Sequence, residues 1–238
     1  MRLTTQQYDE IEIKYMSDSA DGQEDEIFEL IENLELDADD YRGFRFRAYL
    51  KSLVDDYEGG IDDCNMAIML EPMYADAYHL RMMLHQYVDD LVSAIADIDA
   101  LVELLPDLLG LYCHRAVFKN RIKDYEGAIS DANLELDRNP KDTFSNLQRA
   151  YAKSMLGFKK ESLEDYDRIV AMQPDSGIVY KMRADEYYKQ ELYQQALEDY
   201  NLAIAFEPDY EDAYHCRGDA KFKLGDKEGA KQDWDVKT

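Results

Sequence analysis

Residues 177–210 read GIVYKMRADEYYKQELYQQALEDYNLAIAFEPDY and contain the pattern that decides the fold. One face of the first half carries five residues at helical spacing: Val179, Tyr180, Arg183, Ala184 and Tyr187. A second apolar stripe runs from Ala196 to Ile204. Pro208 then closes the segment, because proline cannot continue a helix. The stretch therefore predicts two helices of about 13 residues each, joined by a short break.

The same pattern recurs along the chain with a period of 34 residues. All five prolines share this spacing: Pro72, Pro106, Pro140, Pro174 and Pro208. Two columns of small residues share it too: Ala48, Met82, Ala116, Ala150, Ala184, Gly218 and Gly60, Ala94, Ala128, Ser162, Ala196, Ala230. An aromatic column reads Phe44, Tyr78, Tyr112, Asn146, Tyr180, Tyr214. Separate columns with one period indicate a stack of repeated helical hairpins.

Two charged columns follow the period without a gap. The arginines are Arg47, Arg81, Arg115, Arg149, Arg183 and Arg217. The aspartates lie 16 residues further on, at Asp63, Asp97, Asp131, Asp165, Asp199 and Asp233. On antiparallel helices each arginine can reach an aspartate of its own hairpin, or one in the next. We interpret the two columns as a structural ion-pair ladder rather than a ligand-binding set.

This arrangement resembles the tetratricopeptide repeat family. The resemblance covers residues 41–238, as six repeats: 41–74, 75–108, 109–142, 143–176, 177–210 and 211–238. It implies an all-α fold, a right-handed superhelical solenoid of stacked helical hairpins with a concave groove, forming one continuous domain. Residues 1–40 depart from the pattern and carry 14 acidic and 2 basic residues. We expect them to form a degenerate N-terminal hairpin that caps the first repeat.

The charge of the chain limits the kinds of partner it can have. Its 238 residues include 52 acidic and 27 basic ones, for a net charge of −25. Nucleic acid and anionic membranes both favour basic surfaces, so neither is expected as a partner. No apolar run is long enough to cross a bilayer, and the first residues lack the core of a signal peptide. With three scattered cysteines and no disulfide framework, we expect an acidic cytoplasmic protein.

No catalytic, metal-binding or cofactor-binding motif emerges from the sequence. Cys113–His114 and His215–Cys216 are adjacent pairs, and adjacent helical residues point about 100° apart. Such pairs cannot grip one metal ion or share one proton. Glycine-rich phosphate loops and nucleophile elbows are also missing. We therefore expect a protein that is not an enzyme and needs no cofactor or metal.

The resemblance also implies where a ligand would bind. In the family, contacts come mainly from the first helix of each repeat, at positions off the packing stripe. Thirty such positions carry six basic and four acidic residues, so the groove escapes the acidic excess. The peptide-binding residues predicted in this way are Arg45, Tyr49, His79, Met83, Tyr87, Val117, Asn120, Arg121, Leu147, Tyr151, Met155, Lys181, Tyr188 and Lys189. The alternative is that some of these residues pack between neighbouring hairpins and do not bind a ligand.

These features predict an adaptor or scaffold that binds a protein or peptide segment with apolar side chains and an acidic group. The family's carboxylate-binding mode is not expected, because its asparagine column here reads Tyr49, Met83, Val117, Tyr151, Asp185, Asp219. The alternative is a self-assembling scaffold, a homo-oligomer that stacks through the last repeat and its Trp234.

The acidic excess predicts an unusual response to salt. Raising the salt concentration from about 10 to 300 mM shortens the Debye length from about 30 Å to under 10 Å and screens the self-repulsion. The melting temperature measured by circular dichroism should therefore rise over this range. A melting temperature that falls would mean that the arginine–aspartate pairs outweigh the net charge.

Overall fold

The computed structural model describes residues 1–17 and 22–236. Within these ranges the chain forms helices and no strands. The helices are α1 (Thr5–Ser17), α2 (Glu24–Asn33), α3 (Tyr41–Ser52), α4 (Tyr57–Leu70), α5 (Ala75–Tyr87), α6 (Leu91–Leu104), α7 (Leu111–Arg121), α8 (Tyr125–Arg138), α9 (Thr143–Met155), α10 (Lys159–Met172), α11 (Gly177–Lys189), α12 (Tyr193–Phe206), α13 (Glu211–Lys223) and α14 (Lys227–Trp234). The predicted all-α class is confirmed.

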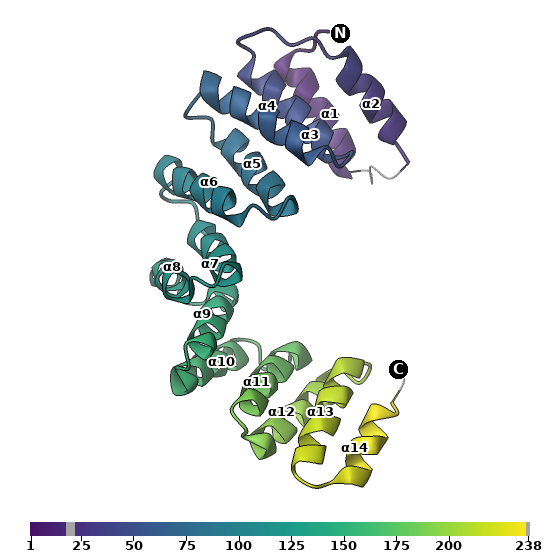
Figure 1. Ribbon diagram of the computed structural model, residues 1–238, viewed down its shortest axis with the longest axis vertical. Helices are drawn as coiled ribbons and strands as arrows, with labels where there is room; N and C mark the ends of the chain where they lie inside the picture. The colour runs from purple at the N-terminus through teal and green to yellow at the C-terminus, as the bar shows by residue number, and fades with distance from the viewer. Residues whose placement is uncertain (18–21, 237–238) are drawn as a thin grey trace. The chain divides into compact units, whose positions relative to one another are not determined.

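The chain divides into two compact units, Met1–Phe118 and Lys119–Thr238, and the boundary falls inside α7. In each unit, helices that follow one another along the chain pair as antiparallel hairpins, and the hairpins stack (Figure 1). In the second unit, α11 to α14 lie side by side in this way. The predicted stacking of helical hairpins is therefore confirmed within each unit.

The second helices begin with the caps that the sequence indicates. The Asp56, Asp90, Asp124 and Asp226 carboxylates each accept a hydrogen bond from the backbone amide three residues on, at 2.9–3.1 Å. These contacts satisfy amides that the helix itself leaves unpaired. A Cβ atom at Gly127 would collide with the Asp124 carboxylate. The same close approach is found at Gly59 and Gly229, whereas Ser93 holds this position after Asp90 with the same capping hydrogen bond.

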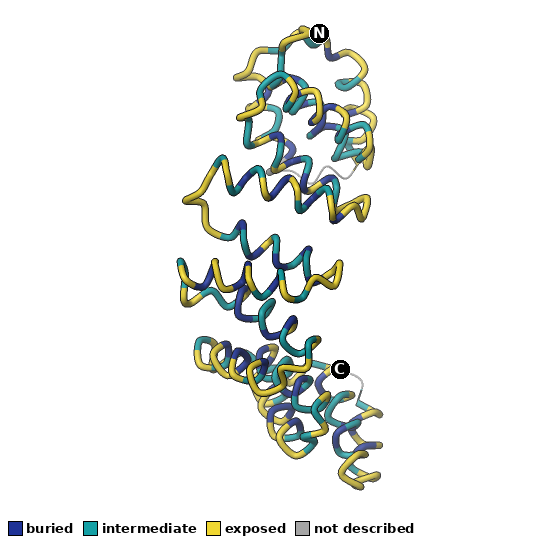
Figure 2. The backbone as a smooth tube through the Cα atoms, turned by 60° about the vertical axis from the view of Figure 1, so that its left-hand side comes forward, coloured by how far each residue is buried: buried dark blue, intermediate teal, exposed yellow. Residues whose placement is uncertain are grey.

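The two columns of small residues lie where the helices of each hairpin cross. Ala150 and Ala184 on first helices, and Ser162 and Ala196 on second helices, have no exposed surface. The Ser162 hydroxyl donates a hydrogen bond to the Ala150 carbonyl oxygen at 3.0 Å, so the two helices lie close enough for a serine side chain to span them. Figure 2 shows the result, with buried positions along one side of each helix and exposed positions along the other.

The N-terminal hairpin packs against the first repeat. Thr4 and Gln7 form a capping box at the start of α1: the Thr4 amide donates to Gln7 Oε1 at 2.9 Å, and the Gln7 amide donates to Thr4 Oγ1 at 3.4 Å. The Tyr8 ring stacks on Phe46 of α3 with centroids 4.7 Å apart. Ile27 of α2 joins the same core and is completely buried.

Among the described residues, no helix has both the length and the apolar character needed to cross a membrane.

The break between the helices of each hairpin uses a left-handed residue. The residue at this break has a φ angle between 59° and 91° in six hairpins. These residues are Asp55, Asp89, Lys123, Gly157, Glu191 and Gly225. Only glycine adopts this conformation without steric cost, so the four other residues hold the turn under strain.

Substitutions at this turn should therefore change stability in opposite directions. Glu191→Gly should raise the free energy of unfolding by about 0.5–1 kcal/mol, because it removes the strain. Gly157→Ala should lower it by about 1 kcal/mol. A Cβ atom at Gly157 meets nothing within 4 Å, so the loss would report backbone strain alone. Urea unfolding measures both, and a stabilising Gly157→Ala would contradict the assignment.

Candidate functional site

The arginine and aspartate columns face each other inside each hairpin. Arg149 Nη2 lies 2.7 Å from Asp165 Oδ1, and Arg149 Nε donates to the second carboxylate oxygen at 2.9 Å. The same two-pronged contact joins Arg47 to Asp63, Arg81 to Asp97, Arg183 to Asp199 and Arg217 to Asp233. Arg115 and Asp131 belong to different units; their contacts within each unit are Arg115 with Asp99 and Asp131 with Lys119.

Five of the six arginines also reach back to the preceding hairpin. Nη1 of Arg81, Arg115, Arg149, Arg183 and Arg217 donates to Asn65, Asp99, Asn133, Asp167 and Asn201 respectively, at 2.6–2.9 Å. Five guanidinium groups stack on the aromatic residue three positions earlier, as Arg217 does on Tyr214 at 5.1 Å, and Arg149 differs because Asn146 takes that position. Arg81, Arg183 and Arg217 are thus occupied on three sides. The Asn/Asp column at 65, 99, 133, 167 and 201 shares the 34-residue period and was missed in the sequence analysis.

A second cation completes most of these pairs. Lysine Nζ atoms at Lys51, Lys119, Lys153 and Lys221, four residues after the arginine, lie 2.6–2.9 Å from the buried aspartate. In the second repeat His85 takes this place, with Nε2 3.9 Å from Asp97 Oδ2.

Asp97 and Asp233 differ in the direction of their pKa shifts. Burial opposes ionisation of the Asp233 carboxyl, but hydrogen bonds from Arg217 and Lys221 outweigh it and lower its pKa. At Asp97 burial dominates over the contact with Arg81, and the pKa is raised above its ordinary value. Asp97, which has His85 in place of the lysine, is therefore less well supported in its ionised form than Asp233.

In the first unit, some of the predicted groove residues already have partners within the protein, and others remain accessible to solvent. Arg45 forms an ion pair with Glu12, and Tyr49 and Val117 pack against buried clusters. Met83 is 39% exposed, and Tyr87 is 63% exposed while stacking on Tyr57 at 4.8 Å. His79 lies at the surface, where partial burial and then the neighbouring His114 lower its pKa.

In the second unit, three of the predicted residues have partners inside the protein or sit in its interior. Asn120 is buried, and its side-chain amide donates to the carbonyl oxygen and to Oε1 of Gln148, both at 3.1 Å. Lys181 pairs with Asp185 at 3.0 Å and with Asp212 at 2.6 Å. Tyr188 contacts the Tyr193 ring edge-on at 5.3 Å. The basic charge expected of the groove is thus largely neutralised at Arg45 and Lys181.

Three other predicted residues, Leu147, Tyr151 and Met155, form a single stripe along α9, with Phe144 at its start. These positions recur at intervals of three and four residues and so share one face of the helix. Phe144, Tyr151 and Met155 are 49%, 38% and 49% exposed. The first part of the stripe, Phe144 and Leu147, lines a cavity of about 320 Å³ between α9, the end of α10 and α11, and Tyr151 and Met155 lie further along the helix. The residues that line this cavity are Thr143, Phe144, Leu147, Ile169, Gln173, Ser176, Ile178, Val179 and Met182.

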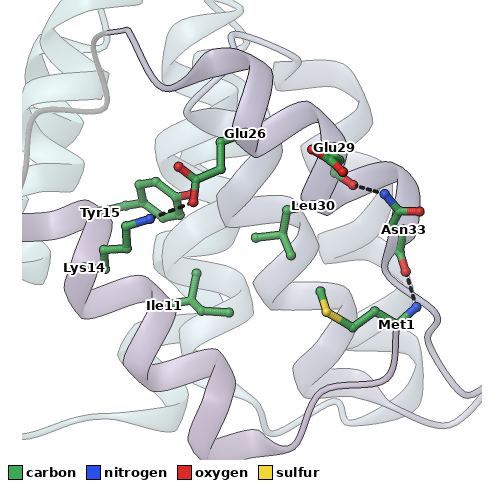
Figure 3. A pocket seen from close by; sticks show the side chains of 8 residues that line it. All are labelled: Met1, Ile11, Lys14, Tyr15, Glu26, Glu29, Leu30 and Asn33. Atoms are coloured by element: carbon green, nitrogen blue, oxygen red, sulfur yellow. Dashed lines mark hydrogen bonds and ion pairs between the residues drawn. The ribbon is translucent and has the colours of Figure 1, made fainter.

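Other cavities fit a ligand less well. One of about 560 Å³ lies between α1 and α2, and Figure 3 shows its charged groups directed at one another, with Lys14 Nζ 2.7 Å from Glu26 Oε1. A cavity of about 220 Å³ brings Tyr188 and Lys189 together with Cys216 on α13. Arg121, the remaining predicted residue, is exposed at the end of α7.

The described residues contain no group of three His, Cys, Asp or Glu side chains placed to hold a metal ion. Burial raises the pKa of the Cys64 thiol to about 12 and that of Cys216 to about 11. Both thiols are therefore protonated at neutral pH and are poor nucleophiles.

Comparisons with known proteins agree on the fold. Residues 184–225 match the family model described as TPR repeat. A tetratricopeptide repeat protein from Parabacteroides merdae is 19% identical with a TM-score of 0.71, covering 96% of this chain and 91% of that one. YrrB, a TPR protein with an unusual peptide-binding site, is 18% identical with a TM-score of 0.61, covering 80% and 97%. PilW, a type IV pilus biogenesis factor, is 15% identical with a TM-score of 0.67, covering 81% and 90%. The comparison with curated proteins gave no match.

The histidine at position 85 yields a testable difference. His85→Lys should lower the pKa of Asp97 and raise the free energy of unfolding at pH 7 by about 0.5–1 kcal/mol. Because a lowered carboxyl pKa stabilises only the ionised form, this gain should disappear as the pH falls below about 4. The matched variant Lys221→His should destabilise. Thermal unfolding between pH 3 and 7 measures both, and a His85→Lys gain that persists at pH 3 would refute the electrostatic explanation.

Proposed function

We propose that this chain, a tetratricopeptide-repeat protein by its fold and by the family match over residues 184–225, is a non-enzymatic adaptor that binds a peptide segment of a protein partner between α9 and α11. The tetratricopeptide-repeat fold is a protein–protein interaction scaffold, and proteins of this kind are generally not enzymes. YrrB, which shares the fold, has a peptide-binding site in its description.

The observation that carries the proposal is the exposed stripe on α9 beside an apolar cavity. Phe144, Tyr151 and Met155 leave part of their aromatic and thioether side chains exposed to solvent, and burial of this apolar surface by a partner would be favourable. Ile178, 47% exposed, faces the same cavity from α11. Apolar and aromatic side chains that converge on a concavity are the usual composition of a binding hot spot. Since Lys181 already has two acidic partners, the proposed segment is primarily apolar rather than acidic.

A second candidate function is self-association through α13 and α14. Phe222, Leu224 and Trp234 are 49%, 44% and 40% exposed, and the Phe222 and Trp234 rings lie 5.8 Å apart. Exposed apolar side chains that lie together favour pairing with another protein surface. Light scattering at high protein concentration separates the two candidates, because the α9 site does not require a second copy.

Panning a random-peptide display library against the immobilised chain tests the main proposal. Peptides recovered on the wild type should bind the double variant Tyr151→Ala, Met155→Ala at least about tenfold more weakly, because both residues contribute contact area. Leu202→Ala, which removes a side chain of similar exposure (40%) from α12, is the matched control and should change affinity less than about twofold. Fluorescence anisotropy with a labelled peptide measures the affinities.

If every recovered peptide binds the double variant as well as the wild type, the interface lies elsewhere. If affinity falls only with Phe222→Ala or Trp234→Ala, the α13–α14 surface replaces the α9 site.

A further inference from the structure

The residue immediately before each first helix forms a column that changes character along the chain. Tyr74 precedes α5, Ser176 precedes α11 and Tyr210 precedes α13, and these positions share the 34-residue period. The other members are Asp40, Leu108 and Asp142; Leu108 lies three residues before α7 rather than immediately before it. Asp142 caps α9, accepting a hydrogen bond from the Ser145 amide at 2.7 Å. Ser176, by contrast, makes no capping hydrogen bond with its side chain.

The two tyrosines of this column fill the space beside the preceding first helix. The Tyr74 ring meets the Tyr41 ring of α3 edge-on, with centroids 4.9 Å apart. Tyr74 also lies near Arg45, and burial raises its pKa to about 12. Tyr210 holds the corresponding position before α13 and is partly buried. Burial raises the pKa of its hydroxyl group, and the charge of Lys181 on α11 opposes this rise.

The repeat period identifies the corresponding place at Ser176. Thr143 lies three repeat periods after Tyr41. Leu147 lies three periods after Arg45 and one period before Lys181. A tyrosine at 176 would therefore lie against Thr143 and Leu147. Serine is too short to do so, and the cavity of about 320 Å³ occupies that place. The cavity therefore lies at the position that Tyr74 and Tyr210 occupy in their own repeats.

The size and lining of the cavity suit an aromatic side chain. A dry apolar cavity of about 150 Å³ holds benzene, so about 320 Å³ accepts a ring with its Cβ and backbone attachment. Ile169 and Val179 are almost fully buried at the cavity wall, and Met182 adds a thioether that favours contact with a ring edge. Phe144 stands at the rim, 49% exposed, where it can meet a second ring edge-on.

We propose that the cavity at Ser176 receives an aromatic side chain from a partner protein segment, in the position that Tyr74 and Tyr210 fill from within the chain. This proposal rests on the proposed function and specifies its ligand. The partner supplies a phenylalanine, tyrosine or tryptophan, and the α9 stripe contacts the residues on either side. An aliphatic side chain would leave much of the cavity empty and lose contacts with its walls.

The test fills the cavity from within. In Ser176→Tyr the new ring should occupy the cavity, and aromatic peptides recovered on the wild type should bind at least about tenfold more weakly. Ser176→Ala, which leaves the cavity open, should bind them as the wild type does. Should Ser176→Tyr fail to fold by circular dichroism, Leu147→Phe closes the cavity from the opposite wall and should give the same loss.

Binding of a small aromatic compound tests the aromatic pocket independently of peptide binding. N-acetyl-phenylalaninamide, titrated to millimolar concentration, should shift the methyl resonances of Ile169, Val179 and Met182 in the wild type and not in Ser176→Tyr. N-acetyl-alaninamide should shift none of them. No shift with the aromatic probe, or peptides that bind Ser176→Tyr as tightly as the wild type, would overturn the aromatic pocket. Peptides that bind Ser176→Tyr unchanged but are lost with Tyr151→Ala, Met155→Ala would leave the adaptor function standing without it.

Discussion

Arg81, Arg149, Arg183 and Arg217 are each fixed between two second helices, and this contact joins neighbouring hairpins within a unit. A guanidinium group has a rigid fork of five donors. Arg183 directs Nε and Nη2 at Asp199 in its own hairpin and Nη1 at Asp167 in the preceding one. A buried carboxylate is costly unless it is paired, so Asp199 is tolerated only with its arginine in place. The same group therefore closes one hairpin and sets its position on its neighbour.

This arrangement separates the residues that hold the fold from those that are free to vary. The ladder, the small columns and the caps repeat with little change, whereas the outer face of the first helices differs from repeat to repeat. The fourth repeat departs from two of the neighbouring patterns. Asn146 replaces the ring under Arg149 and accepts a hydrogen bond from it at 3.4 Å. Ser176 stands where Tyr74 and Tyr210 stand in two other repeats, and it borders the cavity.

The sequence was sufficient for the elements that depend on local spacing. Helix positions, the aspartate caps and the glycine turn at Gly157 follow from patterns a few residues long, and the structure has them. The contact from Arg81 back to Asn65 could not be read in this way, although both columns are visible. It depends on the offset between consecutive hairpins, which is a property of their packing rather than of either column.

The candidate site was less predictable for the same reason. Lys181 reads as a free base in the sequence, but Asp212, 31 residues away, neutralises it. Asn120 fits the groove pattern, yet packing turns its amide inward to Gln148. Leu147, Tyr151 and Met155 were identified because helical spacing alone places them on one face. The cavity was not identified from the sequence, because its relation to the repeat is apparent only when the surroundings of Ser176 are compared with those of Tyr74 and Tyr210.

The most direct test of this account is a crystal structure of the chain with an aromatic peptide selected against it. We expect the aromatic ring of the peptide to lie among Ile169, Val179 and Met182, with Ser176 at its edge and the peptide backbone running along α9. A ring bound instead in the cavity beside Cys216, or on the outer face of the second helices, would contradict the claim that binding takes place where the repeat lacks its own ring.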